Sequence, residues 1–270
     1  MRIGILGAGA VGCYLGARLA NAGSVVTLVG RKRLIDAAGE QGLHYEGLSG
    51  GLVRVDPDQL RLSERAEALE ECDCVFVTVK SGQTQEAAEI LAPILSKSCP
   101  VVSFQNGVRN SAILKETLPE SPILAGIVPF NVIWDEPAIF RQGTSGPLVL
   151  QDSHALAREL ATKFESAGLP IELIADMQPL QWGKLLMNLN NAINALSGVP
   201  LVEELHDRDY RVCLAASQSE ALGLLRRAGI KMASPLKLPF SWVPYVLRSP
   251  TPVFSRVARA MLHVGPEARS

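Results

Sequence analysis

A lysine and two asparagines are spaced along one predicted helix so that they share a face. Lys184, Asn188 and Asn191 lie at i, i+4 and i+7 in a mostly apolar stretch. Asparagine is a poor helix former, so its repeated use favours a polar cleft, with a solvent-facing stripe as the alternative. An ammonium can donate a proton to a carbonyl oxygen that is becoming negative, and amides can bind a hydroxyl or carboxylate. The pattern therefore predicts Lys184 as a general acid.

A glycine-rich turn near the start of the chain predicts a second kind of chemistry. Residues 7–12 read G-x-G-x-x-G between an apolar run and a helical pattern: Gly7, Ala8, Gly9, Ala10, Val11 and Gly12. Gly7 allows a tight turn, Gly9 lets the backbone approach a pyrophosphate, and Gly12 lets the helix pack closely. The helix N-terminus adds positive partial charge. We expect a dinucleotide site here; the alternative is a purely structural glycine turn.

The next predicted strand, 25–29, indicates which dinucleotide binds. A site for NAD usually has Asp or Glu about twenty residues after the glycines. This chain has Arg31, Lys32 and Arg33 there instead. The planar guanidinium of Arg31 matches a 2′-phosphate, and Lys32 or Arg33 could add charge. The segment predicts NADP(H) binding, with a solvated basic loop as the alternative.

Two further candidates follow buried strands. Lys80 comes after the apolar run 74–79, and Asn106 follows the run 101–104. Ligands of doubly wound sheets bind at the carboxyl ends of strands. Lys80 is placed to meet phosphate or substrate, and Asn106 to offer an amide to the nicotinamide or ribose. The alternatives are a surface lysine and a tight turn at Asn106-Gly107.

The elements that must position these residues alternate between strand and helix patterns. This alternation predicts an α/β fold, an N-terminal Rossmann doubly wound sheet over 1–175 followed by a mostly α-helical domain over 176–270. Expected in the first domain are helices at 10–22, 84–95, 110–118 and 153–167, a hairpin at 42–55, and strands at 25–29, 74–79, 101–104, from 123, 148–150 and 171–174. Expected in the second are helices at 177–196, 203–228 and 252–262.

The composition argues against several classes of function, among them nucleic-acid binding and membrane association. The 270 residues carry a net charge of −1 and are 47% hydrophobic, which favours a soluble protein with a sizeable core over a nucleic-acid binder. We find no apolar run of about 18 residues and no secretory signal pattern, so no membrane partner is expected. Five irregularly spaced cysteines predict reduced thiols and a cytoplasmic protein, and four scattered histidines predict no metal site.

Taken together, these motifs resemble the ketopantoate reductase family (2-dehydropantoate 2-reductase) along the whole chain. The matching pieces are the glycine motif 7–12, Arg31, Val79-Lys80, Gln105-Asn106-Gly107, and Trp182-Gly-Lys184 with Asn188. The resemblance implies NADPH-dependent reduction of a 2-keto acid, ketopantoate to pantoate in pantothenate biosynthesis. It implies that Lys184 is the acid, that Asn188 and a neighbouring asparagine hold substrate, and that Arg31, Lys80 and Asn106 contact NADPH. Asn106 is also implied to touch substrate.

The chain departs from the family pattern in two places. The second helix asparagine is expected eight residues after the lysine, where this chain has Ala192. Asn191 and Asn194 are the candidates, and Asn191 keeps the face better. The family also continues past the equivalent of Ser270 into a helix with a substrate-binding serine and a glutamate near the cofactor. We therefore expect that this sequence lacks a C-terminal tail.

The sequence leads to one expected function and two rivals. NADPH would bind across the Rossmann sheet, and a small 2-keto acid would bind in a cleft between the domains. One rival is another NADP-dependent hydroxy-acid dehydrogenase of similar architecture. The other is a non-catalytic NADP(H)-binding sensor. The physiological keto acid and the oligomeric state are left open, with a homodimer among the options.

Overall fold

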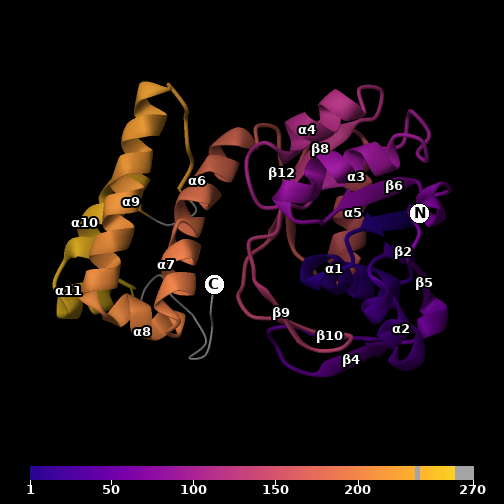
Figure 1. Ribbon diagram of the computed structural model, residues 1–270, viewed down its shortest axis with the longest axis horizontal. Coiled ribbons are helices and arrows are strands. Elements are labelled where there is room, and N and C mark those ends of the chain that lie inside the picture. The colour runs from indigo at the N-terminus through magenta and orange to yellow at the C-terminus, as the bar shows by residue number, and fades with distance from the viewer. Residues whose placement is uncertain (235–237, 259–270) are drawn as a thin grey trace. The chain divides into compact units, whose positions relative to one another are not determined.

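The computed structural model describes residues 1–234 and 238–258 (Figure 1). The chain divides into two compact units, Met1–Met177 and Gln178–Ser270, so the division falls shortly after the predicted boundary at 175. The predicted last helix, 252–262, runs past the described residues, since 259–262 lie outside them. The chain end on which the expected missing tail depends also lies outside them.

The first unit contains an eight-stranded sheet, which confirms the predicted α/β fold of Rossmann type. Its order is β12-β11-β8-β7-β6-β1-β2-β5. The strands, in chain order, are β1 Arg2–Leu6, β2 Val25–Val29, β5 Leu60–Ser63, β6 Cys74–Val77, β7 Val101–Ser103, β8 Ile123–Ile127, β11 Leu148–Gln151 and β12 Ile171–Ile174. The strands from β5 to β8 are parallel, whereas β11 is antiparallel to β8. From β1 the chain moves outward to β2 and β5 and returns to β6 on the other side. The strand order therefore reverses between β1 and β6, the usual place for a ligand.

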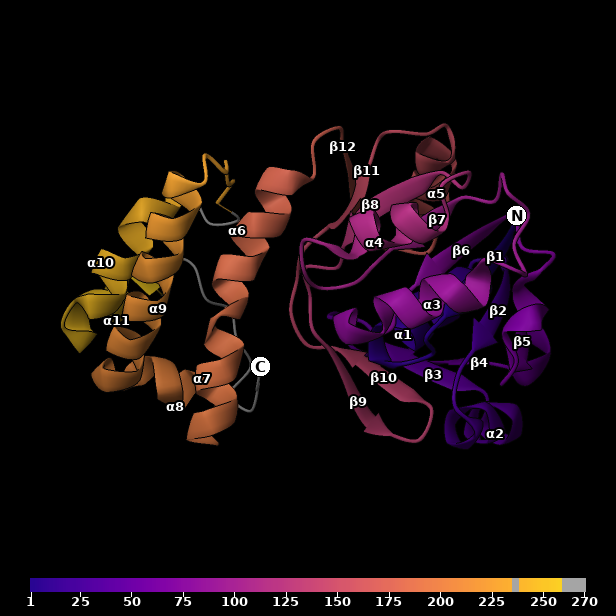
Figure 2. The same ribbon diagram turned by 45° about the horizontal axis from the view of Figure 1, so that its top comes forward.

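Helices cover both faces of this sheet because its strands are apolar on both sides. On one face, α1 (Ala10–Asn21) and α5 (Leu156–Ser166) pack on side chains such as Ile5 and Phe76. On the other face, α3 (Thr84–Leu91) and α4 (Asn110–Thr117) pack on Val75 and Val77 (Figure 2). The predicted end of the third helix at residue 95 is wrong. It ends at Leu91, because Pro93 has no N–H group with which to continue the helical hydrogen bonds.

A second, four-stranded sheet has the order β4-β3-β10-β9. Its strands are β3 Leu43–Glu46, β4 Leu52–Val55, β9 Val132–Glu136 and β10 Ile139–Gln142. The hairpin of β3 and β4 confirms the hairpin expected at 42–55, and β10 joins it in parallel alongside β3. This sheet packs on α1, where the Tyr14 hydroxyl donates to Gln142 Oε1 at 2.8 Å. Helix α1 is therefore packed between two sheets.

The basic segment after β2 is the start of a helix. Arg31 is the N-cap of α2, Lys32–Gln41, so Lys32 and Arg33 lie in its first turn. The alternative of a solvated basic loop is therefore wrong in its local structure. Three single 3₁₀ turns complete this unit: η1 Pro57–Gln59, η2 Ala66–Leu69 and η3 Ser81–Gln83.

All the regular elements in the described residues of the second unit are helices. Its elements are α6 Gln178–Asn188, α7 Asn190–Ser197, α8 Leu201–His206, α9 Arg208–Arg227, η4 Phe240–Trp242, α10 Val243–Arg248 and α11 Thr251–Ala258. The predicted single helix over 177–196 is interrupted at Leu189, and the carbonyl of Leu186 accepts from Gln218 of α9 at 3.3 Å. The predicted helix over 203–228 is divided at Asp207, whose carboxylate caps α9 by accepting from Asp209 N.

A fully buried arginine organises the core of this unit. Arg211 donates hydrogen bonds to the carbonyls of Leu205 and His206, at the end of α8, and of Leu247 and Ser249, at the end of α10. Carbonyls at helix C-termini carry partial negative charge, so they stabilise the buried cation. The Phe254 ring of α11 lies 4.3 Å from the guanidinium carbon. Arg211 therefore joins the C-terminal ends of α8 and α10 to α11.

Candidate active site

Three turns meet at the carboxyl ends of neighbouring strands. Gly7–Gly9 follows β1, Thr78–Ser81 follows β6, and Gln105–Gly107 follows β7. These strands are adjacent in the sheet, so the turns lie at one edge. The Thr78 hydroxyl links two of them by donating to the Gly7 carbonyl at 2.7 Å. The structure thus brings the glycine motif, Lys80 and Asn106 to the same edge.

The glycine turn has the geometry that a pyrophosphate requires. Gly7 has a φ of +105°, and a Cβ on Gly12 would lie 2.5 Å from the Gly7 carbonyl oxygen, so neither position accepts a side chain without strain. A Cβ on Gly9 would instead project into open space, with its nearest neighbour, Gly7 O, 3.9 Å away. Gly9 is the N-cap of α1, with no side-chain cap and no acid in the first turn. The first N–H groups of α1 therefore remain available to an anion, and the site fits a dinucleotide.

The three cations after β2 differ in their partners. The Lys32 ammonium lies 3.1 Å from Asp36 Oδ1 and 4.0 Å from Glu64 Oε1. Its hydrogen bond with Asp36 raises the pKa of Lys32. Arg31 and Arg33 are exposed and make no ion pair with any residue in 1–234 or 238–258. Lys32 and Arg33 are the two residues expected to add positive charge beside Arg31. Of the two, only Arg33 has no carboxylate partner among the described residues.

Lys80 and Asn106 are both exposed, and their turns are joined through backbone groups. The Asn106 carbonyl accepts from Asn110 Nδ2 at 2.7 Å and from the Ser81 hydroxyl. Sequence reasoning missed the buried polar residues beneath these turns, Thr84 and Asn110, and gave no role to Gln105. For Thr84 and Asn110, the sequence signal that could have found them is a polar side chain at the start of an otherwise apolar helix face.

The second unit carries the predicted acid. Lys184 and Asn188 lie one turn apart in α6 and are half-buried. Burial lowers the pKa of Lys184 to about 8. Asn191 is exposed and belongs to α7, so it lies beyond the one-residue break at Leu189 from Lys184 and Asn188. Asn194 is buried and donates to Glu204 Oε2 at 2.6 Å and Val199 O at 3.0 Å, which leaves Asn191 as the exposed alternative.

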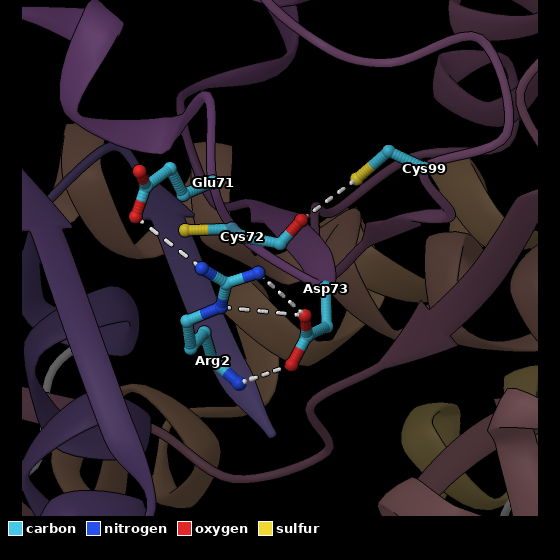
Figure 3. Close-up of polar contacts among 5 residues, drawn as sticks. All are labelled: Arg2, Glu71, Cys72, Asp73 and Cys99. Atoms are coloured by element: carbon cyan, nitrogen blue, oxygen red, sulfur yellow. Dashed lines mark hydrogen bonds and ion pairs between the residues drawn. The ribbon is translucent and has the colours of Figure 1, made fainter.

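The cysteines form no centre of their own. All five are free, and burial raises the pKa of the Cys13 and Cys74 thiols and raises that of Cys99 to about 11. Figure 3 shows the Cys99 thiol bound to the Cys72 carbonyl while the Cys72 thiol points away from it. Within 1–234 and 238–258, no three His, Cys, Asp or Glu side chains are grouped to hold a metal ion. None of the helices in the described parts of the chain is long and apolar enough to cross a membrane.

Comparisons with known proteins show which family and fold this chain resembles. Residues 3–154 match the family model described as ketopantoate reductase PanE/ApbA. A 2-dehydropantoate 2-reductase from Pyrococcus horikoshii is 30% identical over 246 residues, covering 88% of this chain and 78% of that protein. The crystal structure of a PanE/ApbA family ketopantoate reductase from Ralstonia eutropha is 30% identical with a TM-score of 0.82, covering 100% of this chain and 83% of that one. A D-mandelate dehydrogenase solved with NADH shares the fold, with 21% identity and a TM-score of 0.78 over 93% of this chain and 80% of that one.

Proposed function

Since this chain belongs to the ketopantoate reductase PanE/ApbA family, we propose that it reduces 2-dehydropantoate to pantoate with NADPH, in pantothenate biosynthesis. The observation that carries the proposal is Lys184, a half-buried lysine whose pKa burial lowers to about 8. A group with that pKa can give up its proton near neutral pH, as a general acid must. The proposal includes a cytoplasmic location, a small-molecule partner only, and a homodimer as the assembly to be tested.

The residues at the carboxyl edge of the sheet would hold NADPH. The backbone of residues 7–12 would bind the pyrophosphate, and Arg31 would bind the 2′-phosphate. Lys80 and Asn106 would contact the nicotinamide half. When bound, the reduced nicotinamide supplies a hydride to the keto carbon of the substrate.

Side chains of the second unit would complete the reaction. The Lys184 ammonium donates its proton to the carbonyl oxygen as negative charge builds on it, so a ketone becomes a hydroxyl group. Asn188 and Asn191 bind the carboxylate and hydroxyl through their amides, and Asn106 contacts substrate from the sheet. Amides suit this role because they do not change protonation with pH.

Replacing Lys184 tests the proposal. We expect Lys184→Ala to lower kcat by about 1,000-fold, the usual contribution of a general acid, with NADPH affinity unchanged. The exposed Lys231→Ala is the matched control in the same unit and should retain full activity. The assay follows the loss of reduced-nicotinamide absorbance with 2-dehydropantoate. Near-normal turnover in Lys184→Ala would refute the assignment.

The pH profile adds a second readout of the same residue. Below about pH 8 Lys184 carries its proton, so keto-acid reduction should proceed and then fall as pH rises through about 8. Oxidation of pantoate needs the neutral amine, so it should rise through the same range. Both steps should disappear from the profile of Lys184→Ala, measured at saturating cofactor.

A substrate panel separates the rival functions. An aryl 2-keto acid belongs in the panel because the fold is shared with a D-mandelate dehydrogenase. A 3-hydroxy acid tests for another hydroxy-acid dehydrogenase in the oxidative direction. Preferred turnover of either compound would replace 2-dehydropantoate as the substrate. Tight NADPH binding without turnover of any compound would favour the sensor.

A further inference from the structure

Four polar side chains are buried directly beneath the turns that carry Lys80 and Asn106. They are Ser103, Gln105, Thr84 and Asn110, whose exposed fractions are 3%, 8%, 0% and 5%. Buried polar groups are costly unless they are hydrogen-bonded, so their arrangement is informative. They come from three places in the chain: the end of β7, the start of α3 and the start of α4.

Gln105 is the centre of the arrangement, and its amide is fully used. Its Oε1 accepts from the Ser103 hydroxyl at 3.0 Å. Its Nε2 donates to Thr84 Oγ1 at 2.9 Å and to the Val79 carbonyl at 3.1 Å. Because the two donor positions face acceptors and the oxygen faces a donor, the amide has one favourable orientation.

Thr84 passes the connection on to α4. Its hydroxyl accepts from Gln105, and its single proton has two acceptors within reach, the Ser81 carbonyl at 2.9 Å and Asn110 Oδ1 at 3.0 Å. Asn110 in turn donates from Nδ2 to the Asn106 carbonyl at 2.7 Å. The contacts therefore form a network from Ser103 to the Asn106 backbone, with a branch at Thr84 to the Ser81 carbonyl next to Lys80, and linked hydrogen bonds reinforce one another.

These buried side chains bind backbone groups beyond the point where the pairing of β6 and β7 ends. The β6–β7 register ends at the pair Val77 and Ser103, and Phe104 N donates to the Val77 carbonyl at 3.0 Å. Beyond that bond, the carbonyls of Val79 and Asn106 are bound by Gln105 and Asn110 instead of by the opposite strand. Val79 directly precedes Lys80, so both candidate cofactor contacts are attached to the same side-chain network.

We infer that the chain Ser103–Gln105–Thr84–Asn110 holds Lys80 and Asn106 in fixed positions for NADPH, so that its members are positioning residues. The inference rests on the proposed function, because it takes Lys80 and Asn106 as cofactor contacts. Thr84 is the joint of the chain, since within the described residues its hydroxyl links Gln105 to the Asn110 amide. Without that hydroxyl, the two turns lose their common support, although the Lys80 and Asn106 side chains are still present.

A double-mutant cycle on NADPH binding tests the inference. Thr84→Val keeps the side-chain shape and removes the hydroxyl, and it should raise the Kd for NADPH about tenfold, a typical effect of one or two hydrogen bonds. In the Lys80→Ala/Asn106→Ala background the same substitution should have no further effect, because the groups that it positions are gone. Thr84→Ser restores the hydroxyl and should restore the wild-type Kd.

Thr27→Val is the matched control. Thr27 is a threonine of β2 with an exposed fraction of 2%, away from these turns, and its loss should lower Tm without changing the Kd for NADPH. An equal increase in Kd caused by Thr84→Val in both backgrounds, or no increase in either, would refute the positioning role alone. Wild-type affinity in Lys80→Ala/Asn106→Ala would instead refute the proposed cofactor contacts, and the inference with them.

Discussion

The amino and carboxyl edges of the eight-stranded sheet differ in whether their cations have carboxylate partners. At the amino edge, Arg2 forms ion pairs with Asp73 at 3.2 Å and Glu71 at 3.3 Å, and its backbone N–H donates to Asp73 Oδ2 (Figure 3). At the carboxyl edge, Arg31 and Lys80 have no carboxylate partner among the described residues. The Arg2 cation at the first edge is paired, whereas the second edge pairs Lys32 but leaves Arg31, Lys80 and the first N–H groups of α1 for an anion from outside. Substitutions at the first edge should change stability, and those at the second should change cofactor binding.

The largest effect on cofactor binding should come from Gly9→Ala. The added methyl group meets nothing closer than 3.9 Å in the protein, and the Gly9 backbone (φ −98°, ψ −165°) is extended, so the substitution should not strain the fold. The methyl group would occupy the space that a pyrophosphate needs above α1. We expect the Kd for NADPH to rise about 100-fold, since charge-assisted hydrogen bonds are lost. Titration calorimetry measures the Kd, and thermal unfolding checks the stability.

A glycine elsewhere in the same unit provides the control. A Cβ added to Gly39 of α2 would also meet open space, so Gly39→Ala adds the same methyl group away from the carboxyl edge. It should stabilise the protein by about 0.5–1 kcal/mol, because alanine loses less backbone entropy on folding than glycine does. The affinity for NADPH should be unchanged. Equal NADPH affinity in Gly9→Ala and Gly39→Ala would mean that the turn does not bind the cofactor.

A smaller effect, confined to one cofactor, is expected at Arg31. Arg31→Ala should raise the Kd for NADPH about 30-fold, equivalent to about 2 kcal/mol for a charge-assisted contact, and leave NADH binding unchanged. Lys32→Ala should change neither, because Asp36 and Glu64 already pair with that ammonium. Equal losses of NADPH and NADH affinity in Arg31→Ala would show that Arg31 does not bind the 2′-phosphate.

The smallest effect is expected at the amino edge. Asp73→Asn should lower the free energy of unfolding by no more than about 1 kcal/mol, because the ion pair is exposed, and it should leave NADPH affinity unchanged. The hydrogen bond from Arg2 N is the main reason that the pKa of Asp73 is lowered. A carboxyl group with a lowered pKa stabilises the fold above its ordinary pKa of about 3.9, and this stabilisation is lost as pH falls through the lowered value. Acid unfolding of wild type and variant should therefore converge at low pH; a constant difference would exclude this origin.

Much of the first unit could be predicted because its signals are local. The predicted strands 25–29 and 171–174 match β2 and β12. Strand β2 is a mostly buried apolar run between turns, and β12 is a short, mostly aliphatic strand at the edge of the sheet. The strands β9 and β10 are absent from the sequence prediction, because β9 is exposed and charged and β10 pairs with β3, far earlier in the chain. Nothing in the local sequence around residue 43 indicates that partner.

The same distinction applies to the candidate site. The glycine motif and the basic segment are contiguous, so their chemistry could be inferred from composition and spacing. The helix interruption at Leu189 has no glycine or proline to mark it, and the carbonyl of Leu186 is bound by Gln218 from another helix. The Gln105–Thr84–Asn110 connection likewise depends on three elements meeting in space.

The second sheet also has a consequence for the order of assembly during synthesis. The hairpin of β3 and β4 is translated well before β10, its partner on the far side of β3. Until Ile139–Gln142 emerges from the ribosome, β3 presents a row of unpaired N–H and C=O groups. Helix α1 also lacks its contacts with β10 until then. A nascent chain that stalls before Gln142 therefore carries an open sheet edge, through which unfinished chains can pair with one another.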